Sequence, residues 1–194
     1  MELLYLWINF NIKKMENTTS PAKSSLIYGL LFGVIMILEF VIGYVLNIDP
    51  QTNQSYGIMI NILNFFVLPS TFIYLGCNNY KTKFNSGFIS FGECLKIGVT
   101  ICIIAGLISA LFSTVFGMIF PEYFEEMYRK ISKMMIEKNP QMTKEQLDMA
   151  VSMMKKFSNP AIAIPASIAI YAFIGLIYSL IIGAIVKKDP NQSF

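Results

Sequence analysis

The chain has 194 residues, of which 55% are hydrophobic and 14% are charged, against about 25% charged residues in soluble domains. Its formal net charge of +3 is too small to indicate nucleic-acid binding. The absence of histidine excludes catalytic dyads and metal sites that depend on imidazole. Cys77, Cys94 and Cys102 have no zinc-binding spacing, so we interpret them as small apolar residues and expect neither a metal nor another cofactor.

Residues 1–20 are predicted to form an N-terminal tail. An apolar run precedes Lys13 and Lys14, which is the reverse of the order in a signal peptide. One hypothesis is that Met15 is the true start of the protein. Ser20 followed by Pro21 is typical of a helix start, with Ser20 as the N-cap and Pro21 in the first turn.

Four long apolar segments follow this tail and predict an all-α integral membrane protein built as a four-helix bundle. They run over residues 24–46, 57–76, 93–120 and 161–186. About 20 helical residues cross a hydrocarbon core of about 30 Å. Pro69 predicts a kink in the second segment, and the alternative is three spans with this segment re-entrant. Residues 21–188 are interpreted as one membrane domain, followed by a C-terminal tail over 189–194.

The placement of lysines predicts the orientation of the chain. They occur before the first span (Lys13, Lys14, Lys23), between the second and third (Lys81, Lys83) and after the fourth (Lys187, Lys188). The loop over residues 47–56 contains neither Lys nor Arg. The positive-inside rule therefore predicts that both termini and the loop over residues 77–92 are cytoplasmic. The segment over residues 121–159 is then extracytoplasmic.

The loop KFNSGFISFGECLKIG, residues 83–98, has glycines spaced as in a phosphate-binding loop. Glu93 and Cys94 occupy the positions where such a loop needs its lysine and its magnesium-binding hydroxyl. Ser90 and Glu93 have instead the spacing of a capping box, S-x-x-E. We therefore interpret this loop as the start of a helix.

Glu39 is the only ionisable side chain well inside a predicted span, where a carboxylate costs about 3 kcal/mol on insertion scales. Three further polar residues fall near the same depth, so we predict one polar layer of Glu39, Asn64, Ser113 and Ser167. The interpretation that we favour is a protonated Glu39 hydrogen-bonded to Asn64, which joins two helices. The alternatives are an ion or proton site and an exposed interfacial carboxylate.

Small residues recur at four-residue spacing in the third and fourth spans. They are Gly98, Cys102, Gly106, Ala110 and Thr114 in the third span, and Gly175, Ser179 and Gly183 in the fourth. Small side chains allow helices to approach closely in lipid, so these faces are predicted to pack against other helices. Packing within one bundle and packing between two protomers are both compatible with this pattern.

Residues 121–159 predict an amphipathic helical hairpin between the third and fourth spans. One apolar stripe consists of Tyr123, Met127, Ile131, Met134 and Met135, and the second of Leu147, Ala150, Val151, Met154 and Phe157. Thr143 and Gln146 predict a capping box that opens the second helix. We favour a hairpin that lies on the bilayer surface or caps its own bundle. Its many methionines leave partner binding as the alternative.

Two stretches of the chain also resemble a known family. They are NSGFISFGECLKIG, which enters a span that ends in FPE, and the closing IGLIYSLIIGAIVKK. Over roughly residues 20–188 the chain resembles domain-of-unknown-function family 4199, which consists of small bacterial membrane proteins. This resemblance implies a four-span protein of the bacterial inner membrane, and it supplies no catalytic residues.

These observations predict a non-enzymatic membrane protein that binds or organises other membrane components, because the residues present offer no catalytic arrangement. Its expected partners are the lipid bilayer and either another membrane protein or a second copy of itself, with no nucleic acid. The alternative is a small proton- or ion-coupled transporter component using Glu39, although the spans show no inverted repeat. An intramembrane enzyme is the third class, and Glu39 lacks the second carboxylate that such chemistry needs.

Overall fold

The computed structural model describes residues 19–50 and 53–188, which are helical apart from short connections. The proposed start at Met15 and nearly all of the two predicted tails lie outside the described residues. Four helical stretches are long and apolar enough to span a membrane: α2 (Pro21–Val45), Gln54–Phe84, α5 (Phe91–Ile119) and α8 (Pro160–Val186). These stretches confirm the predicted all-α fold with four candidate spans, and the second is a helical run of 31 residues, long enough to cross a membrane.

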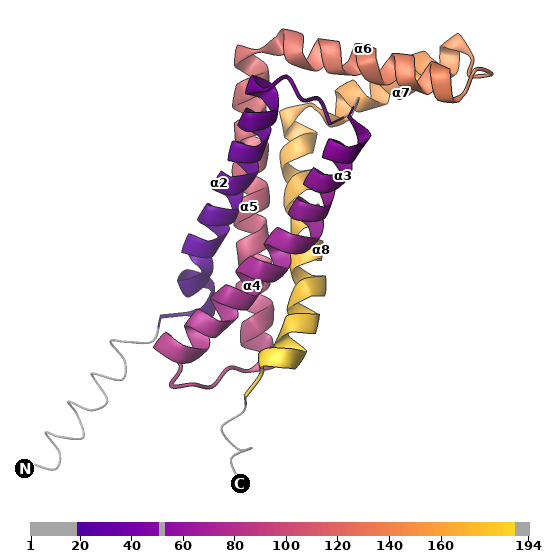
Figure 1. Ribbon diagram of the computed structural model, residues 1–194. Coiled ribbons are helices and arrows are strands. Elements are labelled where there is room, and N and C mark those ends of the chain that lie inside the picture. Colours follow the sequence, from indigo (N-terminus) through magenta and orange to yellow (C-terminus); the bar gives the residue numbers. More distant parts are fainter. Residues whose placement is uncertain (1–18, 51–52, 189–194) are drawn as a thin grey trace, which may run out of the picture.

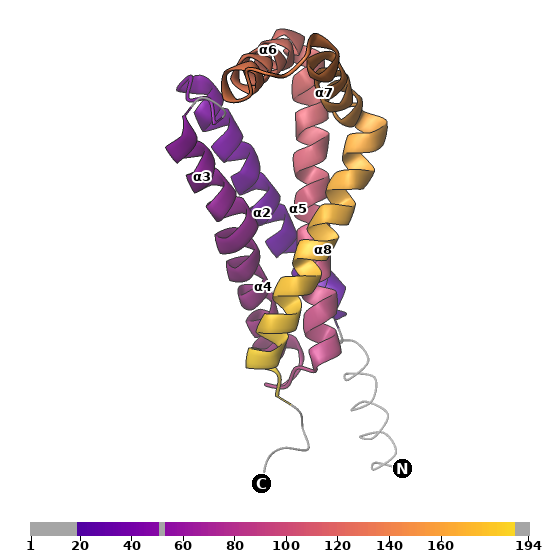
Figure 2. The same ribbon diagram turned by 90° about the vertical axis from the view of Figure 1, so that its right-hand side faces the viewer.

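Successive spans run in opposite directions, so α2 begins and α8 ends at the same end of the bundle (Figure 1). The central helix α5 packs against both α2 and α8. At the opposite end, α6 (Pro121–Lys138) and α7 (Lys144–Phe157) form the predicted hairpin. The hairpin lies across the ends of the spans, roughly perpendicular to them (Figures 1 and 2).

The second span is interrupted by a wider helical turn just before its proline. It consists of α3 (Gln54–Ile62), a π-helical turn (Leu63–Val67), α4 (Leu68–Asn79) and a second π-helical turn (Tyr80–Phe84). Pro69 has no backbone N–H to donate to the preceding turn, and π-helical turns are a common cause of bends in helices. The predicted distortion at Pro69 is therefore present as a π-helical turn.

Three predicted helix starts are confirmed by their capping hydrogen bonds. The Lys23 backbone N–H donates to Ser20 Oγ at 3.2 Å. In the loop before α5, the Glu93 N–H donates to Ser90 Oγ at 3.3 Å and the Ser90 N–H donates to Glu93 Oε2 at 2.7 Å. Thr143 forms the equivalent capping box at the start of α7. The loop over residues 83–98 therefore begins a helix, as its sequence indicated.

The small residues of α5 and α8 lie at the crossing of these two helices. A Cβ atom on Gly98 would overlap Ser179 Oγ, and one on Gly175 would lie 2.8 Å from the Gly98 carbonyl oxygen. A glycine also allows α2 to approach α5 closely, because a Cβ on Gly29 would lie 2.8 Å from Ile104 Cβ. Gly29, Gly98 and Gly175 thus make their close helix contacts within one chain.

The hairpin is fixed to the spans by aromatic rings and by one ion pair. The buried Phe116 ring lies with its centroid 4.8 Å from that of Phe40 and 5.4 Å from that of Tyr123. Lys130 Nζ lies 3.0 Å from Asp49 Oδ2, in the connection between the first two spans. This hydrogen bond raises the pKa of Lys130 above its ordinary value. The direction of α6 is therefore set by contacts with α2, α5 and the connection that follows α2.

The two predicted apolar stripes of the hairpin are half-buried, except for one residue. Phe157 is 61% exposed, and it follows Met149 and Met153 at four-residue spacing. These two methionines are also exposed. Phe157 therefore continues an exposed apolar stripe on α7 that also contains these two methionines.

Candidate functional site

The four residues of the predicted polar layer occupy two separate places. Glu39 and Asn64 lie against each other, between α2 and the π-helical turn of the second span. Ser113 and Ser167 instead line a cavity between α5 and α8. Similar depth along the spans does not bring the four together, because the two serines lie on the faces of α5 and α8 that border the cavity.

Glu39 and Asn64 form a hydrogen bond between their side chains. Asn64 Nδ2 donates to Glu39 Oε2 at 2.7 Å and also to the Ile60 carbonyl oxygen at 3.2 Å. Among the described residues, the buried atoms Glu39 Oε1 and Asn64 Oδ1 have no hydrogen-bond partner. Both are acceptors if Glu39 is ionised, whereas a protonated Glu39 carries an O–H donor. The chemistry of this pair therefore favours a neutral Glu39.

The described residues contain no group of three or more His, Cys, Asp or Glu side chains arranged to hold a metal ion. Cys77, Cys94 and Cys102 are free thiols and are all buried. Their surroundings are those of small core residues.

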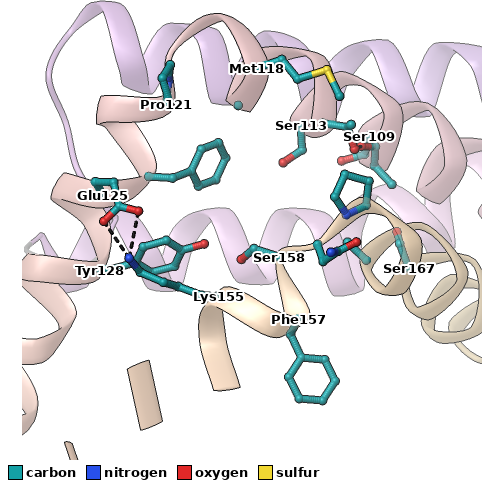
Figure 3. Close-up of a pocket in the computed structure, with 17 residues that line it drawn as sticks. Ser109, Ser113, Met118, Pro121, Glu125, Tyr128, Lys155, Phe157, Ser158 and Ser167 are labelled. Carbon is teal, nitrogen blue, oxygen red and sulfur yellow. Dashed lines mark hydrogen bonds and ion pairs between the residues drawn. The ribbon is translucent and has the colours of Figure 1, made fainter. Parts of the chain in front are cut away.

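A cavity with a volume of about 720 Å³ lies at the hairpin end of the bundle. Its lining comes from the last turns of α5, the first turns of α8 and the two hairpin helices α6 and α7 (Figure 3). Serine side chains from both spans point into this region in the close-up, opposite the charged residues of the hairpin (Figure 3). Volumes of this size are typical of small-molecule sites.

The cavity exists because α5 and α8 separate above their crossing point. The two helices are in contact at Gly106, where Tyr171 packs and where Ser167 Oγ donates to the Gly106 carbonyl oxygen at 3.1 Å. Pro165 lies inside α8 just beyond this contact. Ala110 was predicted to pack against another helix, but it lines the cavity instead. The small stripe of α5 therefore changes from a packing surface to a cavity wall along its length.

Two charged residues of the hairpin lie at the edge of the cavity. Lys155 Nζ on α7 lies 2.9 and 2.8 Å from the two carboxylate oxygens of Glu125 on α6 (Figure 3). It also lies 5.5 Å from the centroid of the buried Tyr128 ring. The Glu125 and Lys155 side chains are 65% and 46% exposed. Exposed ion pairs are weak, so each of these two side chains can exchange its partner for a charged group of a ligand.

The hydroxyl groups of the cavity differ in whether they already form a hydrogen bond within the protein. Thr114 donates to the Ala110 carbonyl oxygen at 2.9 Å, and Ser158 donates to the Met154 carbonyl oxygen at 3.0 Å. Within the described part of the chain, Ser109 and Ser113 have no protein hydrogen-bond partner although they line the cavity. The hydroxyls of these two serines are therefore available to a ligand.

The sequence matches the family described as Protein of unknown function (DUF4199) over residues 27–188. The chain belongs to this family. The matched region contains the Glu39–Asn64 pair, the cavity and the whole hairpin. No curated protein and no solved structure matches the chain. The chemistry of the site is therefore argued from its geometry.

Proposed function

We propose that this member of the DUF4199 family is a non-enzymatic, multi-span protein of the bacterial inner membrane that binds a lipid-like membrane component beneath its hairpin. The observation that carries the proposal is the cavity of about 720 Å³ between α5, α8 and the hairpin. Ligand sites usually combine apolar walls with a few polar groups. This cavity has such walls, two unpartnered serine hydroxyls and one exposed ion pair.

The distribution of charge supports a cytoplasmic location for both termini. Lys23, Lys81 and Lys188 all belong to the end of the bundle where α2 begins and α8 ends. By the positive-inside rule, that end faces the cytoplasm. The hairpin and its cavity then face the opposite, extracytoplasmic side, at the level of the outer leaflet.

The exposed stripe of α7 supports contact between the hairpin and the bilayer. Met149, Met153 and Phe157 are 67%, 57% and 61% exposed. Apolar side chains on one face of a surface helix insert at the boundary between headgroups and acyl chains. A hairpin held on the bilayer in this way keeps the cavity beside the lipid that would enter it.

Native mass spectrometry of the protein purified in mild detergent tests the proposal. We expect the wild type to retain lipid-sized adducts, and Ala163→Trp to lose most of them because the indole fills the cavity that Ala163 lines. Ala161→Trp is the matched control, because Ala161 is exposed on the same helix. Equal retention by the wild type and Ala163→Trp would overturn the proposed function.

A further inference from the structure

We propose that the cavity selects a phospholipid whose zwitterionic headgroup carries a primary ammonium, as in phosphoethanolamine lipids; this inference rests on the proposed function. The Glu125–Lys155 ion pair recognises both charges of that headgroup. Lys155 pairs with the phosphate, and Glu125 accepts hydrogen bonds from the ammonium. The Glu125–Lys155 ion pair is thereby replaced by two ion pairs, one between Lys155 and the phosphate and one between Glu125 and the ammonium.

Charge balance favours a zwitterion over an anionic lipid. Among the described residues that line the cavity, Glu125 and Lys155 are the charged ones, and their charges cancel. An anionic headgroup would take Lys155 and leave the Glu125 carboxylate beside a second negative charge, which is unfavourable. A zwitterion gives each charged side chain a partner and leaves no net charge in the site.

The ring of Tyr128 adds a second feature suited to a cation. It lies beneath Lys155 Nζ at 5.5 Å and is itself buried. Cations are attracted to the face of an aromatic ring at this distance. When Lys155 turns to a phosphate, the ring face becomes available to the ammonium held by Glu125.

The unpartnered hydroxyls of Ser109 and Ser113 lie where the ester groups of a phospholipid would arrive. Ser113 is six residues before the end of α5 at Ile119, or roughly 9 Å deeper in the membrane, and Ser109 is one turn deeper again. Ester carbonyls lie on the hydrocarbon side of the phosphate and accept hydrogen bonds. Ser113 and Ser109 therefore supply donors below the ion pair, in the order that the ligand requires.

The experiment compares the retention of defined lipids by the full chain in detergent, measured by native mass spectrometry. Equimolar phosphatidylethanolamine and phosphatidylglycerol with identical acyl chains are the probes. We expect the wild type to prefer phosphatidylethanolamine. Glu125→Gln should lower this preference about five-fold, as for the loss of one exposed charge contact. Glu126→Gln removes the same charge one residue further along α6, where Glu126 pairs with Lys130, and it should leave the preference unchanged.

The possible results separate this inference from the proposed function on which it rests. An equal preference in the wild type and Glu125→Gln, with adducts still lost in Ala163→Trp, overturns the headgroup selection and leaves lipid binding in place. A wild type that prefers phosphatidylglycerol also overturns it. Adducts that persist equally in Ala163→Trp overturn both proposals. Circular dichroism melting of each variant shows that these differences do not arise from unfolding.

Discussion

At the scale of single residues, the Glu39–Asn64 pair has the clearest physical consequence. It joins α2 to the π-helical turn of the second span through a hydrogen bond of 2.7 Å. The two remaining oxygen atoms of the pair have no partner among the described residues. A neutral Glu39 supplies the donor that Asn64 Oδ1 needs, so the pair is expected to act as a structural link between helices.

Glu39→Gln should preserve the folded protein, because an amide keeps the oxygen that accepts from Asn64 Nδ2 and supplies an N–H donor. Glu39→Leu should lower the free energy of unfolding by about 1 kcal/mol, the range of hydrogen bonds between membrane helices. Thermal unfolding in detergent measures both effects.

The double variant Glu39→Leu/Asn64→Leu is the control for this prediction. It should lose less stability than the sum of the two single variants, because it leaves no unpaired polar partner. A strain with Glu39→Gln that loses function while the melting temperature is unchanged would contradict the structural role. That result would favour the transporter instead.

At the scale of the helices, the crossing of α5 and α8 depends on residues with small side chains. Added to Gly106, a Cβ would lie 2.8 Å from Tyr171 Cδ2 and 2.9 Å from Tyr171 Cβ. The second of these atoms is anchored to the backbone of α8, so the helices must move apart to admit it. Gly92, near the start of the same helix, has no atom within 4 Å of such a Cβ.

Gly106→Ala should therefore destabilise the protein by about 1–3 kcal/mol, the usual cost of overpacking. Gly92→Ala is the matched control and should be neutral or stabilising, because alanine is the better helix former. Gly106→Leu and Ser179→Leu should each be more severe than Gly106→Ala. Wild-type thermal stability in both leucine variants would show that these faces do not pack against each other.

At the scale of the whole molecule, the orientation of the bundle determines which side of the membrane the cavity serves. Labelling of introduced cysteines in intact cells tests this orientation. Asn53→Cys should react with a membrane-impermeant thiol reagent added from outside, and Ser86→Cys should react only after the cells are opened. The three native cysteines are buried, so they should contribute little background.

The reverse labelling pattern would invert the orientation and place the cavity at the cytoplasmic leaflet. The positive-inside rule disfavours this inversion, because Lys81, Lys83 and Lys188 would then lie on the extracytoplasmic side. The orientation is thus tested independently of the lipid-binding experiments.

The sequence by itself determined the spans, the helix starts and the small faces. Each is a local property: the length of an apolar run, a side chain three residues from the N–H that it caps, or a four-residue repeat. Local patterns of this kind predict the same local structure in any fold that contains a membrane-spanning helix. For this reason the capping box at Ser90 and the small stripe from Gly98 to Gly106 were recognisable before the fold was known.

Only the tertiary structure decided which residues share a site. The predicted polar layer used depth alone, and depth does not fix the direction in which a side chain points around its helix. Ser113 and Ser167 therefore joined the cavity and not Glu39. Glu125 and Lys155 are 30 residues apart on two helices, and they meet because the hairpin folds back over diverging spans. Their pairing depends on packing between distant segments, which no local pattern specifies.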